Sequence, residues 1–167
     1  MKEKYKHLLN FVANVLTLAM EAVCFGWVWY EIYVPQPNKA NKFSMRGNWA
    51  VIGMYVLFVF FFTKVLGGYR IGYMRLSDIV LSQVLAVLLA MVVSYFEVCM
   101  VANDYMNPRP LLLMTLTEII FIVPWVCLVR KFYQWLYPPR QMLVIYGNYS
   151  PDDLIDKINT RKDKYNI

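Results

Sequence analysis

The 167-residue sequence contains few charged residues. Lys, Arg, Asp and Glu together make up 17% of it, whereas 59% of it is hydrophobic. Soluble globular domains carry about 25% charged and about 45–50% apolar residues. The charges are also clustered, which leaves long uncharged stretches between them. This composition argues against a soluble domain and predicts an integral membrane protein.

Histidine and cysteine are also scarce, and their positions argue against several kinds of site. The only histidine, His7, lies in the basic N-terminal segment, so no Ser-His-Asp triad is available. The three cysteines, Cys24, Cys99 and Cys127, lie far apart in apolar stretches and form no CxxC pair. Neither a zinc site nor a disulfide framework is supported. We therefore expect no metal and no cofactor in this chain.

The net charge of +6 does not indicate nucleic-acid binding. The Lys and Arg residues lie mainly where apolar stretches end, which is the pattern of membrane topology rather than of a nucleic-acid patch. We therefore expect no nucleic-acid partner.

Four apolar stretches are long enough to cross a membrane, because about 20 residues at 1.5 Å rise span a 30 Å hydrocarbon core. We predict transmembrane helices at about 8–30, 49–66, 79–102 and 111–130. The first stretch is too long for the apolar part of a signal peptide. It ends in Trp27, Trp29 and Tyr30, which are expected to form an aromatic belt at the membrane interface.

Basic residues on one side of the four spans outnumber those on the other. The first group is Lys2, Lys4, Lys6, Lys64, Arg70, Arg75, Arg130, Lys131 and Arg140, and the second is Lys39, Lys42, Arg46 and Arg109. The positive-inside rule then places both termini in the cytoplasm. We predict an all-α membrane domain of four transmembrane helices over residues 1–137, with both termini inside.

The residues after Pro138-Pro139 have a different character. Leu143–Tyr146 is rich in β-branched and aromatic residues and predicts a strand that runs into a turn. Ser150-Pro151-Asp152-Asp153 has the pattern of a helix N-terminus. We expect residues 138–167 to be the start of a cytoplasmic β-α domain of Rossmann-like type, truncated at its end. A bound dinucleotide is not expected, because only Gly147 stands where its fingerprint needs three glycines.

Three carboxylates, Glu21, Glu97 and Glu118, fall inside the predicted spans. An ionisable side chain in hydrocarbon is costly, so each is expected to be either functional or paired. For Glu97 and Glu118 we favour structural hydrogen bonds between helices, with Arg109 or interfacial water as further partners. For Glu21, near the middle of the first span, a functional and a structural role both remain open.

Four basic residues, Arg70, Arg75, Arg130 and Lys131, are candidates for contact with anionic lipid headgroups. The alternative is that they only anchor the topology, which is the more common role of such residues.

Several features in order along the chain resemble the N-terminal part of bacterial polyprenyl (undecaprenyl-phosphate) glycosylphosphotransferases, the initiating sugar transferases of exopolysaccharide and capsule synthesis. The resemblance covers essentially the whole chain. It rests on the four spans, the loop from Gly67 to Asp78 with its Gly-Tyr-Arg and Arg-Leu-Ser-Asp motifs, and the basic and aromatic exit Arg130-Lys-Phe-Tyr133. The Pro138-Pro139 break before a Leu-Val-Ile-Tyr-Gly strand completes it.

This resemblance implies a longer parent enzyme that moves a sugar-1-phosphate from a nucleotide sugar to undecaprenyl phosphate. The reaction would take place at the cytoplasmic leaflet of the bacterial inner membrane, with Mg²⁺ in the parent's catalytic domain. The resemblance places that domain after this region, so no catalytic residue is expected here and the chain alone is expected to be inactive. Its implied partners are the lipid bilayer and, through the parent enzyme, undecaprenyl phosphate; a homo-oligomer is compatible with the sequence.

Two other functions remain open. One is a small four-span transporter in which Glu21 is a proton-coupled binding carboxylate. The other is a membrane interaction protein that has no substrate.

Overall fold

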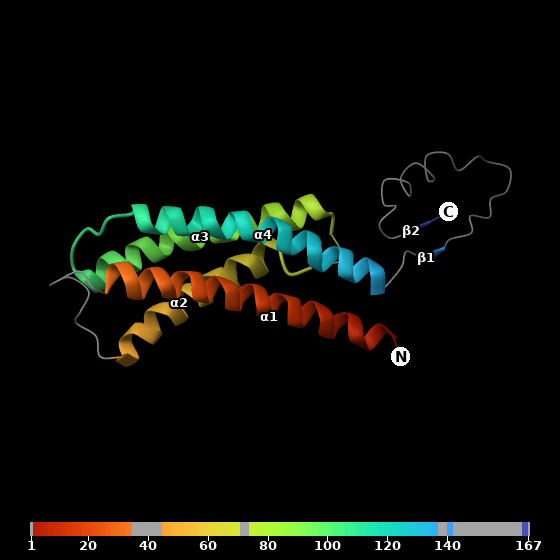
Figure 1. Ribbon diagram of the computed structural model, residues 1–167, viewed down its shortest axis with the longest axis horizontal. Helices are drawn as coiled ribbons and strands as arrows, with labels where there is room; N and C mark the ends of the chain where they lie inside the picture. Colours follow the sequence, from red (N-terminus) through yellow and green to blue (C-terminus); the bar gives the residue numbers. More distant parts are fainter. Residues whose placement is uncertain (1, 35–44, 71–73, 137–139, 142–164, 167) are drawn as a thin grey trace.

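The computed structural model describes residues 2–34, 45–70, 74–136, 140–141 and 165–166, and the side chains within 7–34, 47–70 and 74–136. The described part contains four long helices (Figure 1), and all four are long and apolar enough to cross a membrane. Their bounds are α1 Lys2–Val28, α2 Met45–Leu66, α3 Leu76–Ala102 and α4 Arg109–Leu136. The prediction of four apolar helices in a membrane protein is confirmed.

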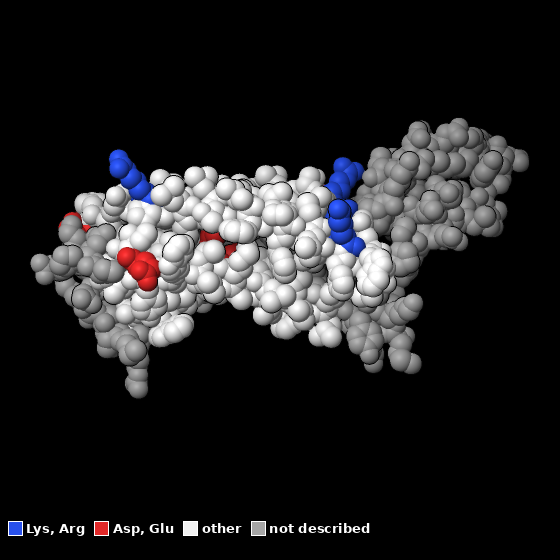
Figure 2. Space-filling view, in the orientation of Figure 1, with Lys and Arg blue, Asp and Glu red and all other residues white. Residues whose placement is uncertain are grey.

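The helices form an up-down-up-down bundle. Helices α1 and α3 each pack against both α2 and α4, so α2 and α4 lie diagonally across the bundle. We call the end where α1 begins and α4 ends the N-terminal end, and the other the opposite end (Figure 1). Figure 2 shows Lys and Arg at the two ends and a mainly uncharged surface between them, as expected of a bundle that crosses hydrocarbon.

All four helices extend beyond their predicted spans: α2 and α3 begin three or four residues earlier, and α4 and α1, counted with the helical turn that follows it, are longer at both ends. Helix α1 passes into a π-helical turn, η1 (Trp29–Tyr33), and its apolar span reaches Tyr33 instead of residue 30. Helix α4 continues past Arg130 to Leu136. Basic residues at the membrane surface end the hydrocarbon span but not the helix, because the backbone hydrogen bonds continue through them.

Helix α2 ends in a Schellman motif that requires a glycine. Gly67 has a φ of 80°, and its N–H donates to Lys64 O at 3.3 Å. The N–H of Gly68 donates to Thr63 O at 2.9 Å, which satisfies another free carbonyl at the helix end. Asn103, with a φ of 53°, ends α3 in the same left-handed conformation.

Helix α3 turns a face of small residues into the bundle. Ala86, Ala90 and Ser94 recur every four residues and are fully buried, and Ala102 at the end of the helix is 5% exposed. Small side chains at such positions allow neighbouring helices to approach closely. The inward face of α3 therefore has small side chains in its middle, between the larger buried residues Ile79, Gln83 and Val98.

Two short strands follow the bundle. The first, β1 (Arg140–Gln141), pairs in parallel with β2 (Tyr165–Asn166). The predicted strand Leu143–Tyr146 and the helix expected after Ser150 lie outside the described residues.

Candidate functional site

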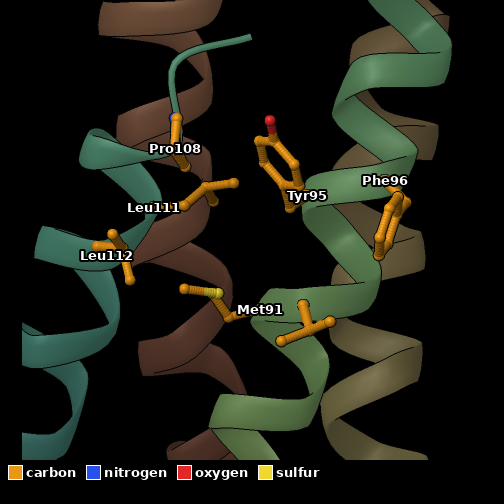
Figure 3. Close-up of a pocket in the computed structure, with 7 residues that line it drawn as sticks. Met91, Tyr95, Phe96, Pro108, Leu111 and Leu112 are labelled. Atoms are coloured by element: carbon orange, nitrogen blue, oxygen red, sulfur yellow. The ribbon is translucent and has the colours of Figure 1, made fainter. Parts of the chain in front are cut away.

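An apolar groove lies between α3 and the start of α4, near the opposite end (Figure 3). Its lining residues are Met91, Val92, Tyr95, Phe96, Pro108, Leu111 and Leu112. The Tyr95 hydroxyl is already engaged, because it donates to Met106 O at 3.2 Å. The wall of this groove thus offers hydrocarbon contacts and no charged group that could orient a polar ligand.

Polar chemistry is instead concentrated inside the bundle. Glu118 of α4 is fully buried, and the Tyr55 hydroxyl of α2 donates to its carboxyl group, 3.0 Å from Oε1 and 2.8 Å from Oε2. This hydrogen bond joins two helices that lie diagonally across the bundle. It is the kind of interhelical hydrogen bond expected of an intramembrane carboxyl, but the partner is Tyr55 and not Arg109.

Glu21 of α1 lies in the same part of the core. It is 2% exposed, and its Oε2 has no hydrogen-bond partner among the described residues. Glu118 is close enough to Glu21 to interact with it electrostatically, and so are Tyr55 and Cys24. Three helices thus bring two carboxyls and a phenol together, although these residues are far apart in the sequence.

No metal centre follows from this arrangement. Among the residues that the structure describes, no three His, Cys, Asp or Glu side chains are grouped so that they could hold a metal ion. The family resemblance places its Mg²⁺ in the parent's catalytic domain, outside residues 1–167.

Glu21 is the innermost member of a row of polar side chains on α1. Asn10, Asn14, Thr17 and Glu21 follow one another at intervals of three or four residues, so they lie along one face of the helix. The Thr17 hydroxyl accepts a hydrogen bond from Trp125 Nε1 of α4 at 3.0 Å and donates to Ala13 O at 3.0 Å. The row therefore faces the interior of the bundle rather than the surrounding lipid.

The outer part of this row binds the segment that follows α2. Asn10 Nδ2 donates to Tyr69 O at 2.9 Å, and Asn14 Nδ2 donates to the same oxygen at 3.3 Å. From the other side, Gln83 Nε2 of α3 donates to Gly68 O at 3.2 Å. These amides fix the turn between α2 and α3 against both α1 and α3.

The orientation of these amides follows from their partners. A backbone carbonyl can only accept a hydrogen bond, so the amide nitrogens must point toward it and the amide oxygens away from it. Asn10 Oδ1, Asn14 Oδ1 and Gln83 Oε1 are buried and have no hydrogen-bond partner in the described part of the chain. Together with Glu21 Oε2, they form a series of free acceptors between the N-terminal end and the middle of the bundle.

Tyr69 connects this segment to the core. Burial raises the pKa of the Tyr69 phenol above its ordinary value, and the neighbouring Glu21 carboxyl raises it further. The Tyr69 hydroxyl is buried, and its ring packs against Phe60 of α2 with ring centroids 5.7 Å apart.

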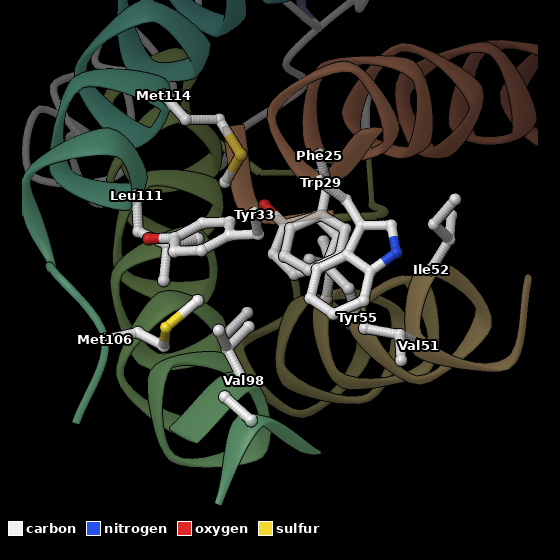
Figure 4. Packing of buried hydrophobic residues seen from close by; sticks show 13 residues of the cluster. Phe25, Trp29, Tyr33, Val51, Ile52, Tyr55, Val98, Met106, Leu111 and Met114 are labelled. Atoms are coloured by element: carbon white, nitrogen blue, oxygen red, sulfur yellow. The ribbon is translucent and has the colours of Figure 1, made fainter. Parts of the chain in front are cut away.

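Beyond Glu21 the inward face of α1 changes from polar to aromatic. Phe25, Trp29 and Tyr33 are at most 1% exposed, and Tyr55 of α2 joins them (Figure 4). The rings of Phe25 and Tyr55 are stacked, with centroids 4.3 Å apart and planes 8° from parallel. We call these four residues the aromatic layer.

Hydrogen bonds fix two members of the aromatic layer. Trp29 Nε1 donates to Asn48 Oδ1 of α2 at 3.3 Å, and the Tyr33 hydroxyl donates to Asn107 O at 2.8 Å. Trp29 was expected in an interfacial belt, and the structure corrects this, because it is fully buried. Of the three predicted belt residues, Trp27 and Tyr30 are exposed.

The remaining predicted site residues lie elsewhere. Glu97 is half-buried in α3, and its Oε2 has no hydrogen-bond partner among the described residues. Arg70, Arg75 and Lys131 are exposed at the N-terminal end, and Arg130 is half-buried there. The four basic residues thus lie where headgroup contact is possible, but well away from the buried carboxyls.

The sequence prediction missed Tyr55, Asn10, Asn14 and Gln83. The regular spacing of Asn10, Asn14, Thr17 and Glu21 was a usable signal for the polar row. Tyr55 and Gln83 carried no comparable signal, because neither belongs to a regularly spaced row of polar residues on its helix.

No protein-family model, curated protein or solved structure matches this chain.

Proposed function

We propose that this chain is the membrane-anchoring region of a polyprenyl-phosphate sugar-1-phosphate transferase, with the catalytic residues outside residues 1–167. In this proposal both termini lie in the cytoplasm, and the membrane is the bacterial inner membrane. The bundle holds the enzyme at the leaflet where its lipid acceptor presents a phosphate. The chain alone carries no catalytic group.

The observation that carries the proposal is the succession of two structures in one chain. A four-helix bundle with a basic N-terminal end is followed, just after α4, by the parallel pair β1 and β2. Parallel strands need a crossover connection of about a dozen residues or more, usually a helix. Residues 142–164 separate β1 from β2, which is long enough for the β-α-β unit that the proposal requires.

The basic residues at the N-terminal end support the same proposal. Exposed Arg70, Arg75 and Lys131 lie at the end from which the β1–β2 pair emerges. Basic side chains at the cytoplasmic surface attract anionic lipid, by about 1 kcal/mol per residue. A lipid phosphate would therefore be concentrated near any soluble domain that follows α4.

The test is a transfer assay in isolated membranes. Residues 1–167 and the complete open reading frame at the same locus are expressed separately and supplied with undecaprenyl phosphate and a panel of labelled nucleotide sugars. We expect the label to enter the lipid fraction only with the complete reading frame. A reading frame that ends at Ile167, no lipid labelling by a longer product, or transfer by residues 1–167 alone would each refute the proposal.

One observation favours a second candidate, a small transporter that uses Glu21. The Glu21 carboxyl is buried near the middle of the bundle and has a free oxygen, as expected of an intramembrane residue that binds a proton or a cation. In proteoliposomes with a proton gradient, this candidate predicts cation uptake that Glu21→Gln abolishes and Glu97→Gln preserves. An absence of uptake by the unaltered chain would eliminate it.

A further inference from the structure

The free acceptors near the N-terminal end are arranged in a row rather than around a point. Asn10 and Glu21 are eleven positions apart on α1, which corresponds to about 16 Å along a helix. Ligands of a single ion lie about 2–2.6 Å from it, so they cannot be spread over such a length. The arrangement therefore suits a series of small hydrogen-bond donors and not one bound ion.

Water is the donor that fits this row. A buried carbonyl or carboxyl oxygen without a hydrogen bond costs several kcal/mol in an apolar interior. Asn10 Oδ1, Asn14 Oδ1, Gln83 Oε1 and Glu21 Oε2 are all buried acceptors of this kind. Buried waters characteristically bind such groups, making about three hydrogen bonds each.

The two ends of the row have different surroundings. Its outer member, Asn10, is half-buried near the N-terminal end, beside the turn that contains exposed Arg70. On the other side of Glu21 the stacked rings of Phe25 and Tyr55 begin the aromatic layer. Side chains that are at most 1% exposed and closely packed leave no path for water in that direction.

We infer that a file of water molecules runs from the N-terminal end along Asn10, Asn14 and Gln83 to Glu21, and that the aromatic layer closes it. Glu21 is then a proton-binding site that exchanges with water on one side of the membrane only. A proton delivered by this water binds the Glu21 carboxylate to give the neutral acid, and returns by the same route.

The groups around Glu21 are consistent with this role. The titratable side chains close enough to interact with it are Cys24 on its own helix, Tyr55 of α2, Glu118 of α4 and Tyr69 of the turn after α2. In the described part of the chain none of these neighbours is a Lys or Arg, so a bound proton is what neutralises the Glu21 carboxylate. Proton exchange at Glu21 is independent of sugar-phosphate transfer. It also differs from transport, because one-sided access produces no flux across the membrane.

Cysteine accessibility tests the path. In a background in which Cys24, Cys99 and Cys127 are replaced by Ala, single cysteines are introduced as Asn14→Cys, Leu16→Cys or Phe25→Cys. Leu16 is the matched control, because it lies two residues from Asn14 on the same helix but is 50% exposed on the outer surface. A membrane-impermeant methanethiosulfonate reagent is applied to right-side-out and inverted vesicles, and circular dichroism confirms that each variant is helical.

We expect Asn14→Cys to react only in the vesicles that expose the N-terminal end. Leu16→Cys should be unreactive in lipid, and Phe25→Cys should be unreactive from both sides. Failure of Asn14→Cys to react faster than Leu16→Cys would refute the water file. Modification of Asn14→Cys or Phe25→Cys from the opposite end would refute the closure by the aromatic layer.

Infrared spectroscopy tests the proton site itself and does not depend on cysteine variants. The carboxyl band of Glu21 is identified by its loss in Glu21→Gln, and its exchange is followed after transfer to D₂O. We expect Asn14→Leu to slow this exchange by about tenfold or more, equivalent to about 1.4 kcal/mol in the barrier. Asn14→Ser should largely preserve it, and Leu16→Ala should leave it unchanged. Equal exchange in Asn14→Leu and the unaltered chain would refute the inference.

Discussion

The Tyr55 hydroxyl donates a hydrogen bond that is shared between both oxygens of the Glu118 carboxyl. This hydrogen bond crosses the diagonal of the bundle. A carboxyl buried in an apolar interior depends on such a partner, because no bulk water can replace it. The contact therefore has two effects. It links α2 to α4 across the bundle, and it fixes the carboxyl that lies next to Glu21.

Removal of the Tyr55 hydroxyl should destabilise the bundle. We expect Tyr55→Phe to reduce the free energy of unfolding by about 1–3 kcal/mol, because it leaves the buried Glu118 carboxyl without its donor. Unfolding in mixed detergent micelles, followed by circular dichroism, measures the change. Tyr30→Phe, at an exposed tyrosine, is the control and should have little effect.

A double variant separates the hydrogen bond from simple loss of packing. When Tyr55→Phe is combined with Glu118→Leu, both polar partners are gone, so the second substitution should recover part of the lost stability. If the double variant lost as much free energy of unfolding as the two single variants together, the proposed coupling would be contradicted.

Gly68 is a second residue at which the structure makes a sharp prediction. A Cβ atom there would lie 2.9 Å from Thr63 Cγ2 and 3.0 Å from Gln83 Cγ. We expect Gly68→Ala to destabilise the bundle by about 1–3 kcal/mol, because the turn after α2 must move away from α3. The same micelle unfolding experiment measures it.

Gly53→Ala is the matched control for Gly68→Ala. A Cβ at Gly53 meets nothing within 4 Å, and Ala favours a helix over Gly by up to about 1 kcal/mol. The control should therefore be neutral or slightly stabilising. A loss at Gly68 no larger than that at Gly53 would show that the turn is not closely packed against α3.

At the scale of elements, α3 is the helix whose packing depends most on small side chains. Ala86, Ala90 and Ser94 bring it close to its neighbours, and Ala90 lies in the same core cluster as the aromatic layer. Its lipid-facing side instead carries large residues such as Leu81, Leu85 and Phe96. Along this face the position of α3 is therefore set by close contact, in addition to the hydrogen bond from Gln83 to Gly68 O.

A larger side chain on this face should separate the helices. We expect Ala90→Leu to lower the free energy of unfolding by about 1–3 kcal/mol through overpacking. Ala19→Leu introduces the same group on the exposed side of α1 and should be tolerated. Unfolding in micelles reports the stability, and equal effects of the two variants would contradict the close packing of α3.

At the scale of the whole molecule, the arrangement of charge predicts one orientation. Among the described side chains, Lys64, Arg70, Arg75, Arg130 and Lys131 lie at the N-terminal end of the bundle, whereas Arg109 lies at the opposite end. With an even number of spans, residues before α1 and after α4 lie on the same side of the membrane. The positive-inside rule assigns that side to the cytoplasm.

Reporter fusions test this orientation. Alkaline phosphatase, which is active only after export, should be inactive when fused after Leu136 and active when fused after Asn107 in the turn between α3 and α4. Green fluorescent protein should show the reverse pattern. Active phosphatase at Leu136 would reverse the orientation and, with it, the proposed access of Glu21 from the cytoplasm.

The sequence by itself determined the class of protein and the number and placement of the helices. Hydrocarbon imposes a length and a composition on any helix that crosses it, so the four spans can be recognised without knowledge of their neighbours. The same local information placed Glu21, Glu97 and Glu118 inside spans. It also placed Arg70, Arg75, Arg130 and Lys131 outside the apolar spans or at their ends.

Only the tertiary structure decided what each of these residues contacts. From the sequence, Trp29 was expected at the membrane interface. In the structure it lies on the same helical face as Phe25 and Tyr33 and is buried with them. The partner of Glu118 is Tyr55, which lies 63 positions away. Hydrophobicity determines that a helix enters the membrane but not which face it turns inward, because lipid and protein interior are equally apolar. That choice is made by packing and by hydrogen bonds between distant residues, and it creates both the polar row and the aromatic layer.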